Sequence, residues 1–188
     1  CDCDTAMHTL RTLLQKNKTV AIGEIGLDYH YEETDKALQH KWFAGQMDIA
    51  RELKLPIAIH SRDAAQDTIQ IMRASRAEEI GGVIHCYSYS KESARDFLNM
   101  GFYFGIGGVV TFKNAKKLKE AVAYIPLSNI VLETDAPYLT PEPFRGKRND
   151  SSKLVYVAQA IADIKQIPVD EVYAETWKNA HQMYKIQK

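Results

Sequence analysis

Two carboxylates and two imidazoles, side chains that commonly bind divalent metals, end four short apolar runs of the chain. They are Glu24, His60, His85 and Asp135, and the runs cover residues 19–24, 55–60, 82–85 and 129–135. A fifth apolar run, 102–107, ends without such a residue. Imidazole favours Zn, whereas carboxylate favours Mg or Mn, so all three metals remain candidates. The four residues together predict a divalent metal site.

Stretches with helical periodicity separate these runs, which are expected to be strands. Helices are expected over residues 4–16, 34–54, 64–79, 91–100, 114–124, 152–165 and 168–184. Alternating strands and helices are typical of an α/β protein with a parallel sheet. The run 19–22 reads as a strand buried on both faces that ends at Glu24. Because such sheets bind ligands beyond the carboxyl ends of their strands, the four polar residues are expected at one face.

Each of the four residues also has an ordinary structural explanation. His60 and His85 can be hydrogen-bonded core residues. Glu24 can pair with a basic side chain, and Asp135 can begin a turn. Their joint position at strand ends favours the metal site. A metal held there lowers the pKa of a bound water, and a carboxylate such as Asp135 is placed to accept the proton of that water. This is the chemistry of hydrolysis.

The composition indicates one globular domain over residues 1–188, with 45% hydrophobic residues. Lys and Arg together equal Asp and Glu at 24 each, so any contact with nucleic acid must be local. No apolar run approaches the roughly 20 residues that a membrane span needs, and no membrane partner is expected. Cys1, Cys3 and Cys86 do not form a disulfide framework. A cytoplasmic location is expected.

Four segments of the chain resemble the signature segments of a known family. They are GEIGLDY at 23–29, PIAIHSRDA at 56–64, GGVIHC at 81–86 and ETDAPYLTPEPFRGKRN at 133–149. They are similar to those of the TatD family of metal-dependent deoxyribonucleases, a branch of the amidohydrolase-like barrels. The resemblance implies a TIM (β/α)8-type barrel, one or two divalent metal ions and hydrolysis of phosphodiester bonds in DNA, often from the 3′ end.

The resemblance also implies roles for single residues. Glu24 matches the metal-bridging glutamate of the family, and His60 and His85 match ligands of one ion. Asp135 matches the ligand and general base at the other ion. The catalytic residues expected on this basis are Asp135 and Glu24. The implied partner is DNA, as single strands or 3′ ends.

One departure from the family is expected to matter. The family begins with a strand ending in a His-x-His motif, which this chain lacks. Eight strand–helix units take about 250 residues. The five units found here are therefore expected to be strands 4 to 8 of an incomplete barrel, the C-terminal portion of the fold. On length alone, a five-stranded doubly wound sheet is a legitimate alternative and would be preferred without the family resemblance. Open sheet edges would favour self-association.

Basic and aromatic residues near the strand ends suggest how a polyanion would be bound. Arg62 follows His60, and its fork of donors suits a phosphate, although a salt bridge to a neighbouring acid explains it equally. The loop after Asp135 carries the further candidates for phosphate binding, which are Arg145, Lys147 and Arg148. The ordinary structural explanation for these three residues is a solvated basic loop.

Tyr87 and Tyr138 are the candidates for stacking on unpaired bases.

Two alternatives to a nuclease remain open. A related barrel metal-hydrolase could act on amides or small phosphoesters, because fold does not fix substrate. A truncated chain could instead hold a partial, inactive site.

Overall fold

The computed structural model describes residues 3–15, 18–31, 33 and 35–186 of the chain. These residues form two compact units. The first runs to Val83 and includes the segment from Met183 onward, and the second covers Ile84–Gln182. Residues 16 and 34, expected at two helix ends, lie outside the described residues.

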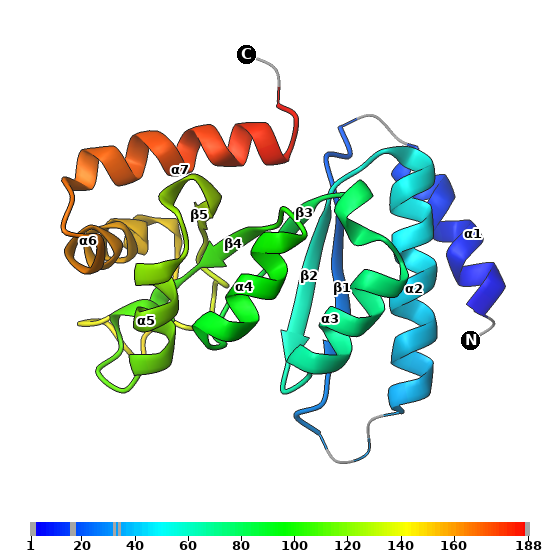
Figure 1. Ribbon diagram of the computed structural model, residues 1–188, viewed down its shortest axis with the longest axis horizontal. Helices are drawn as coiled ribbons and strands as arrows, with labels where there is room; N and C mark the ends of the chain where they lie inside the picture. The colour runs from blue at the N-terminus through cyan, green and yellow to red at the C-terminus, as the bar shows by residue number, and fades with distance from the viewer. Residues whose placement is uncertain (1–2, 16–17, 32, 34, 187–188) are drawn as a thin grey trace. The chain divides into compact units, whose positions relative to one another are not determined.

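Two parallel strands and the helices packed on them make up the first unit (Figure 1). Its elements are α1 (Cys3–Leu14), β1 (Ile22–Asp28), α2 (Lys36–Leu53), β2 (Ile57–Arg62), α3 (Ala65–Ala74), the short helix η1 (Ala77–Glu79) and the first residues of β3 (Gly82–Ile84). The carboxylate of Asp35 caps α2 by accepting a hydrogen bond from the N–H of Leu38 at 2.9 Å. Helix α2 packs on β1 and also contacts α1.

Strands β1 and β2 alternate in burial, which separates a core face from a polar face. Ile25 and Leu27 of β1, like Ile57 and Ile59 of β2, are buried in the core. The opposite face of the pair carries the polar side chains, because successive strand residues point to opposite faces. In the parallel register Gly26 lies opposite His60 and Asp28 lies opposite Arg62.

The prediction that the first strand ends at Glu24 is wrong. Strand β1 begins at Ile22 and continues past Glu24 to Asp28, because β2 extends the ladder alongside it. Gly26 does not mark the end of the strand. Its φ is +143°, and a Cβ there would lie 1.9 Å from the carbonyl oxygen of His60. Gly26 therefore permits the close approach of β2.

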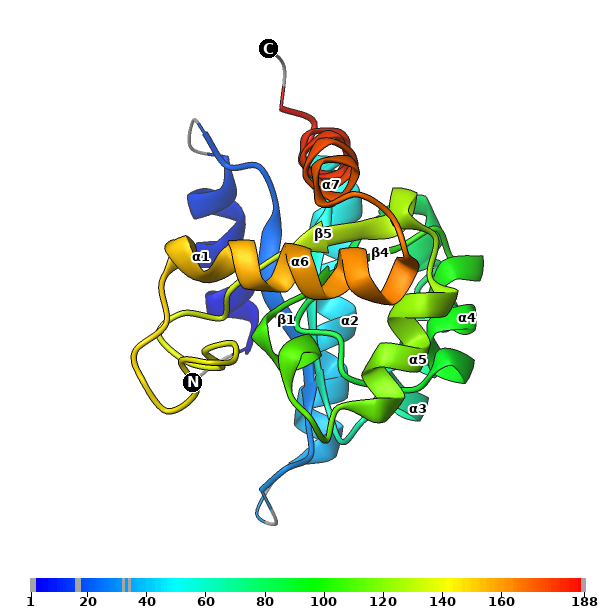
Figure 2. The same ribbon diagram turned by 90° about the vertical axis from the view of Figure 1, so that its left-hand side faces the viewer.

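The second unit contains the remaining strands and helices (Figure 2). Its elements are the end of β3, α4 (Lys91–Asn99), β4 (Tyr103–Ile106), η2 (Gly108–Thr111), α5 (Lys116–Tyr124), η3 (Leu127–Asn129), β5 (Ile130–Leu132), η4 (Ser151–Lys153), α6 (Leu154–Lys165) and α7 (Val169–Met183). Strands β4 and β5 are parallel, with Phe104 opposite Ile130. Helix α5 packs beside both α4 and α6. Phe97, Phe102 and Phe104 are fully buried in this core.

The predicted α/β organisation with parallel strands is confirmed, and every expected strand and helix has a counterpart at shifted ends. The run expected to reach Asp135 stops as a strand at Leu132, and the helix expected over 64–79 divides into α3 and η1. The single domain, the incompleteness of the barrel and the open edges stay predictions. Within the described part of the chain, none of the helices combines the length and apolarity needed to cross a bilayer.

Candidate metal centre

In the first unit, His60 lies between two carboxylates of strand β1. Its Nε2 is 3.1 Å from Oδ2 of Asp28, and its Nδ1 is 3.8 Å from Oε2 of Glu24. An ionised carboxylate only accepts hydrogen bonds, so Nε2 donates a hydrogen bond to Asp28. The other ring nitrogen, Nδ1, faces Glu24.

The carboxylate of Asp28 is kept ionised by its neighbours. Desolvation raises the pKa of this group, but hydrogen bonds from the N–H of His30 and from His60, with the nearby charge of Arg62, outweigh it and hold the pKa below its usual value. The His30 N–H donates to Oδ1 at 2.9 Å. Each oxygen of Asp28 therefore has a defined donor, which fixes the orientation of the carboxylate.

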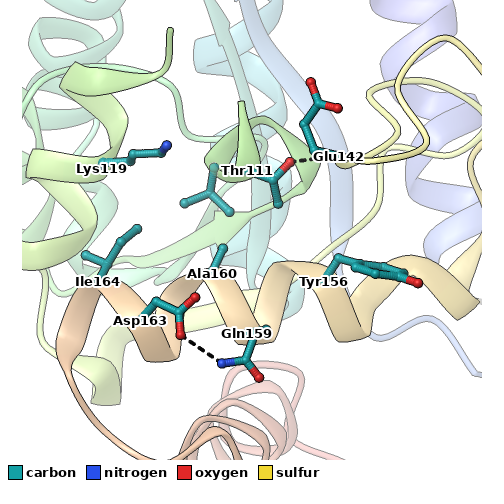
Figure 3. Close-up of a pocket in the computed structure, with 9 residues that line it drawn as sticks. Thr111, Lys119, Glu142, Tyr156, Gln159, Ala160, Asp163 and Ile164 are labelled. Atoms are coloured by element: carbon teal, nitrogen blue, oxygen red, sulfur yellow. Dashed lines mark hydrogen bonds between the residues drawn. The ribbon is translucent and has the colours of Figure 1, made fainter. Parts of the chain in front are cut away.

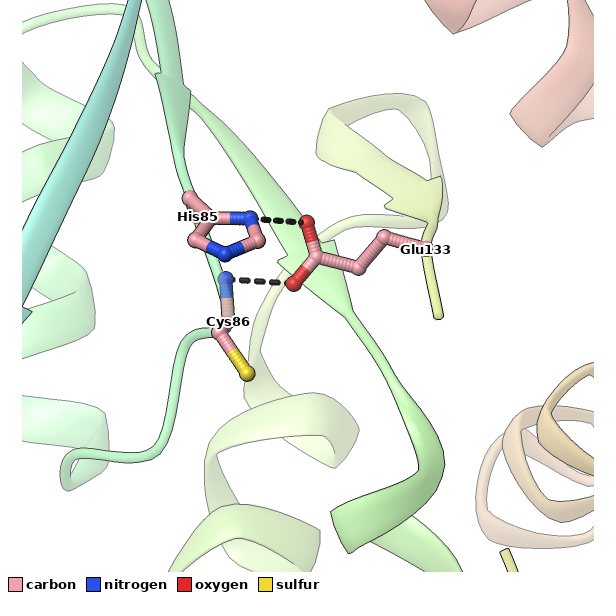
Figure 4. Close-up of side chains that lie close together, drawn as sticks. All are labelled: His85, Cys86 and Glu133. Carbon is pink, nitrogen blue, oxygen red and sulfur yellow. Dashed lines mark hydrogen bonds and ion pairs between the residues drawn. The ribbon is translucent and has the colours of Figure 1, made fainter. Parts of the chain in front are cut away.

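In the second unit, His85 has the same arrangement with the roles of its nitrogens exchanged. It follows β3, and its Nδ1 donates to Oε2 of Glu133 at 3.0 Å (Figure 4). Its Nε2 lies 3.5 Å from Oδ1 of Asp135. The hydrogen bond to Glu133 uses Nδ1, which leaves Nε2 as the nitrogen that faces Asp135.

Asp135 also forms the turn that its ordinary explanation predicts. The N–H of Tyr138 donates to the carbonyl of Asp135 at 2.9 Å, and Asp135 adopts a φ of 55°. Aspartate tolerates this left-handed conformation better than most residues. The turn and the contact with His85 are therefore compatible, because the first uses the backbone and the second the side chain.

The two histidines thus each bring their second ring nitrogen near a carboxylate oxygen. Metal–ligand bonds of about 2.0–2.2 Å place neighbouring ligands of one ion roughly 3.0–3.5 Å apart. The His85–Asp135 separation of 3.5 Å falls in this range, and the His60–Glu24 separation of 3.8 Å is slightly longer. Each pair therefore has a spacing compatible with ligands of a divalent metal ion. The donor set of imidazole and carboxylate suits Zn, Mn and Mg.

A second group of possible metal ligands shares His85 with the His85–Asp135 pair. Ligand atoms of His85, Cys86 and Glu133 lie within 4.8 Å of one another. Figure 4 shows the Glu133 carboxylate facing the His85 ring and the backbone N–H of Cys86, while the Cys86 thiol points to one side. Both oxygens of Glu133 accept hydrogen bonds here. This carboxylate therefore acts as a hydrogen-bond partner of the cluster.

Sequence reasoning missed two residues, Asp28 and Glu133. Both lie inside the signature segments, and a simple signal could have found them. Glu133 precedes Asp135 by two residues, and Asp28 follows Glu24 by four. Residues an even number apart in extended chain tend to share a face. A carboxylate at such a position is a natural partner for the second nitrogen of a metal-binding histidine.

The basic loop between Pro137 and Arg148 encloses a pocket of about 490 Å³. The cationic residues that line it are Arg145, Lys147 and Arg148. Tyr138 lines the same pocket and is 71% exposed. The guanidinium of Arg145 lies 4.3 Å from the centre of the Phe112 ring, a cation–π contact that orients it.

Two buried polar side chains hold this loop in shape. The amide of Asn149, which is 2% exposed, donates to the carbonyls of Thr134 at 2.7 Å and Tyr138 at 2.8 Å. The hydroxyl of the buried Thr140 donates to the carbonyl of Lys147. The basic residues therefore extend from a closed loop whose ends are tied together.

Tyr87 is not available for base stacking, so that prediction is wrong. Its side chain is 2% exposed and meets the rings of Phe97 and Phe104 edge to face. Burial also raises the pKa of its hydroxyl, which donates to the carbonyl of Ser90. A tyrosine two residues after a strand-end histidine looks exposed in sequence, but here it completes the core.

Arg62 is exposed at the end of β2, and its positive charge helps lower the pKa of Asp28, its cross-strand neighbour. This agrees with the ordinary explanation of Arg62 as a partner of a nearby acid. Its phosphate role stays a prediction.

Another pocket in the second unit, of about 350 Å³, lies beside α6 (Figure 3). Its lining mixes charges, with Lys119 opposed by Glu142 and Asp163. Gln159 donates to Asp163 at 2.8 Å, so part of the polar lining is already paired. Because it mixes both signs of charge, the pocket does not favour a polyanion.

Fold and clusters together define an α/β protein with parallel strands and metal-compatible carboxylate–imidazole groups. Residues 2–185 match the protein family described as "TatD related DNase". The chain is 46% identical over 177 residues to a protein of Bacillus subtilis named "Uncharacterized metal-dependent hydrolase YabD", covering 94% of this chain and 69% of that protein. It is 40% identical over 180 residues to the Escherichia coli K12 protein "Uncharacterized metal-dependent hydrolase YcfH", covering 96% and 68%.

Solved structures agree with these matches. The TatD homologue YJJV of E. coli K12 superimposes with a TM-score of 0.92 at 27% identity, over 98% of this chain and 71% of that one. A hydrolase of the TatD family from Entamoeba histolytica gives a TM-score of 0.85 at 24% identity, over 97% and 71%, which shows the shared fold. The chain belongs to the TatD family of metal-dependent hydrolases.

Proposed function

We propose that this protein hydrolyses phosphodiester bonds of DNA, as a 3′–5′ exonuclease acting on single strands or 3′ ends. The observation that carries the proposal is the separation of 3.5 Å between Nε2 of His85 and Oδ1 of Asp135, which suits two ligands of one divalent ion. The match to a family described as "TatD related DNase" supports DNA as the substrate. We also propose the TIM-type barrel of this family as the scaffold, supported by the parallel β1–β2 and β4–β5 pairs.

The proposed ligands of one or two divalent ions are Glu24, His60, His85 and Asp135. When bound, Mg, Mn or Zn would lower the pKa of a water and polarise the phosphoryl oxygen. Asp28 and Glu133 each lie within hydrogen-bond distance of the other ring nitrogen of a proposed histidine ligand, which would fix the tautomer that ligation requires. In each unit the proposed pair of ligands is therefore supported by a carboxylate that accepts a hydrogen bond from its histidine.

Asp135 is the proposed general base. Its carboxylate accepts a proton from the attacking water, whose oxygen forms the new bond to phosphorus. The bond from phosphorus to the 3′ oxygen breaks, and that oxygen takes up a proton as it leaves. Glu24, next to His60 in the first unit, is the other carboxylate proposed to take part in catalysis. This division of roles rests on the partly buried position of Asp135 next to His85.

The basic loop is the proposed binding surface for the strand. Arg145, Lys147 and Arg148 surround a hollow large enough for a nucleotide, and Tyr138 offers an exposed ring for stacking on an unpaired base. Arg62 is a further candidate for contact with a phosphate. These cations give the chain a local positive region although its net charge is zero.

A substrate comparison with the full chain tests the function. Single-stranded DNA labelled at its 5′ end, bis-p-nitrophenyl phosphate and a cyclic amide are each incubated with Mg, Mn or Zn. We expect a ladder of shortened DNA products, lost in Asp135→Asn and on chelation of the metal. Asp163→Asn, in the mixed-charge pocket, is the matched control and should retain activity. Cleavage of the amide without cleavage of DNA would replace the nuclease proposal with an amide hydrolase.

Metal titration by calorimetry tests the alternative of a partial site. Saturable binding of one or two ions per chain, reduced in His85→Ala, supports the proposed centre. A chain that binds no divalent ion and cleaves none of the substrates would instead be an inactive relative, and the proposal would be wrong.

A further inference from the structure

We infer that Glu133 is a positioning residue that fixes the tautomer of His85, and that Gly105 is a glycine because the Glu133 carboxylate occupies the space of a side chain there. The inference rests on the proposed function only in assigning metal ligation to Nε2 of His85. All of the residues that carry it belong to the second unit.

Glu133 is held at both oxygens. Oε2 accepts the Nδ1–H of His85 at 3.0 Å, and Oε1 accepts the backbone N–H of Cys86. The side chains of Glu133 and His85 are 16% and 17% exposed, so water competes little for these bonds. The two donors come from consecutive residues and reach the two oxygens of one carboxylate (Figure 4). These two hydrogen bonds set the plane of the carboxylate and, through it, the orientation of the imidazole ring.

Gly105 of strand β4 provides the room for this carboxylate. A Cβ built at Gly105 would lie 2.1 Å from Oε2 and 2.5 Å from the carboxyl carbon of Glu133. The backbone of Gly105 is not in the left-handed region, so conformation gives no reason for a glycine at this position. The glycine is explained by space, and the space is filled by the group that holds His85.

The N–H of Cys86 makes the chemical consequence of a Glu133→Gln change predictable. A backbone N–H can only donate, so the amide oxygen of the glutamine must face Cys86. Its NH₂ group then faces Nδ1 of His85, which must accept a hydrogen bond and give up its proton. The proton moves to Nε2, the nitrogen that faces Asp135. An almost isosteric change therefore reverses the tautomer and blocks Nε2 as a ligand.

The competing explanation makes Glu133 a direct ligand, together with Cys86 and Nδ1 of His85. That site would use the opposite nitrogen of His85 and would need the Cys86 thiolate. The two explanations differ in the effect of Cys86→Ser. Loss of the thiol leaves the backbone N–H in place, so it should not alter the tautomer or the metal affinity if Glu133 is a positioning residue.

The test uses the full chain labelled with ¹⁵N-histidine, without metal, at a pH where the imidazoles are neutral. Long-range ¹H–¹⁵N spectra report which nitrogen of each ring carries the proton. We expect Nδ1–H for His85 in the wild type and Nε2–H in Glu133→Gln, with the Nε2–H form of His60 unchanged as an internal control. Calorimetry with Mn should show a loss of affinity of about 10- to 100-fold for Glu133→Gln.

A second pair of variants guards against misfolding as the cause. Gly105→Ala should displace Glu133 and lower metal affinity. Gly107→Ala should not, because its Cβ would lie at ordinary contact distances from Glu133, 3.4 Å from the carbonyl oxygen and 3.7 Å from Cγ. An unchanged His85 tautomer in Glu133→Gln, or loss of metal binding in Cys86→Ser, would overturn the inference. If the tautomer reverses as expected but the wild type cleaves no DNA, the positioning role holds and the proposed nuclease function fails.

Discussion

Asp28 of strand β1 accepts a hydrogen bond from Nε2 of His60 at 3.1 Å, just as Glu133 accepts one from Nδ1 of His85. The two histidines are thus fixed through opposite nitrogens, His60 through Nε2 and His85 through Nδ1. In each case the remaining nitrogen faces a second carboxylate. The two histidines can use different nitrogens for the same purpose, because either nitrogen of a neutral imidazole can serve as a metal ligand.

Replacing Asp28 by asparagine should weaken metal binding in the first unit by about 10- to 100-fold. The N–H of His30 donates to Oδ1, so the amide oxygen must face His30 and the NH₂ group must face His60. Nε2 of His60 then loses its proton to Nδ1, the nitrogen near Glu24. Calorimetry with Mn measures the change. Asp48→Asn, an exposed carboxylate of α2, is the matched control, and an equal loss in both variants would contradict this prediction.

Binding of single-stranded DNA should depend on salt through the basic loop. Each lost contact between a cation and a phosphate should reduce the slope of log K against log salt by about 0.7 for single strands. We therefore expect Lys147→Gln and Arg148→Gln each to flatten the slope by about this amount. Fluorescence anisotropy over a range of salt concentrations gives the slopes. Lys119→Gln, in the mixed-charge pocket, should keep the wild-type slope.

The Asn149→Ala change should destabilise the second unit. It leaves the part-buried carbonyls of Thr134 and Tyr138 without their donor, at a cost of about 1–3 kcal/mol for each group left unsatisfied. Urea unfolding should show a loss of at least about 2 kcal/mol. Asn114→Ala, at an exposed position, should change the free energy of unfolding by less than about 0.5 kcal/mol. Equal values for the two variants would mean that Asn149 does not anchor the loop.

Tyr29 should make stability fall at alkaline pH. Desolvation and the hydrogen bond from its hydroxyl to Oδ2 of Asp67 at 2.7 Å raise the pKa of this phenol to about 12. The unfolded chain ionises the phenol near pH 10, so the folded state binds the proton more tightly. The stabilisation is complete below about pH 10 and is lost as the pH rises toward 12.

The measurement compares the wild type with Tyr29→Phe in denaturant unfolding between pH 8 and the alkaline limit of folding. The difference in the free energy of unfolding should be constant up to about pH 10 and should shrink above it. Lys165 is a useful background group, because burial lowers its pKa and it is present in both proteins. A difference that stays constant across the whole range would contradict the predicted role of Tyr29.

The sequence was sufficient for the element order and for the four proposed ligands. Apolar runs and helical periodicity predicted the strands and helices, and the polar residues near the strand ends identified Glu24, His60, His85 and Asp135. It misplaced the end of β1, because the glycines beside Glu24 looked like a strand end. In the structure Gly26 instead allows β2 to approach, and the ladder continues to Asp28.

Residue types and spacing determined which side chains can bind a metal, since these depend on local chemistry and on the alternation of strand faces. Only the tertiary structure decided that Asp28 meets Nε2 of His60, that Glu133 meets Nδ1 of His85, and that Tyr87 lies in the core. These contacts join segments tens of residues apart. They depend on strand register and on the space left by Gly105. Neither can be read from the order of the residues alone.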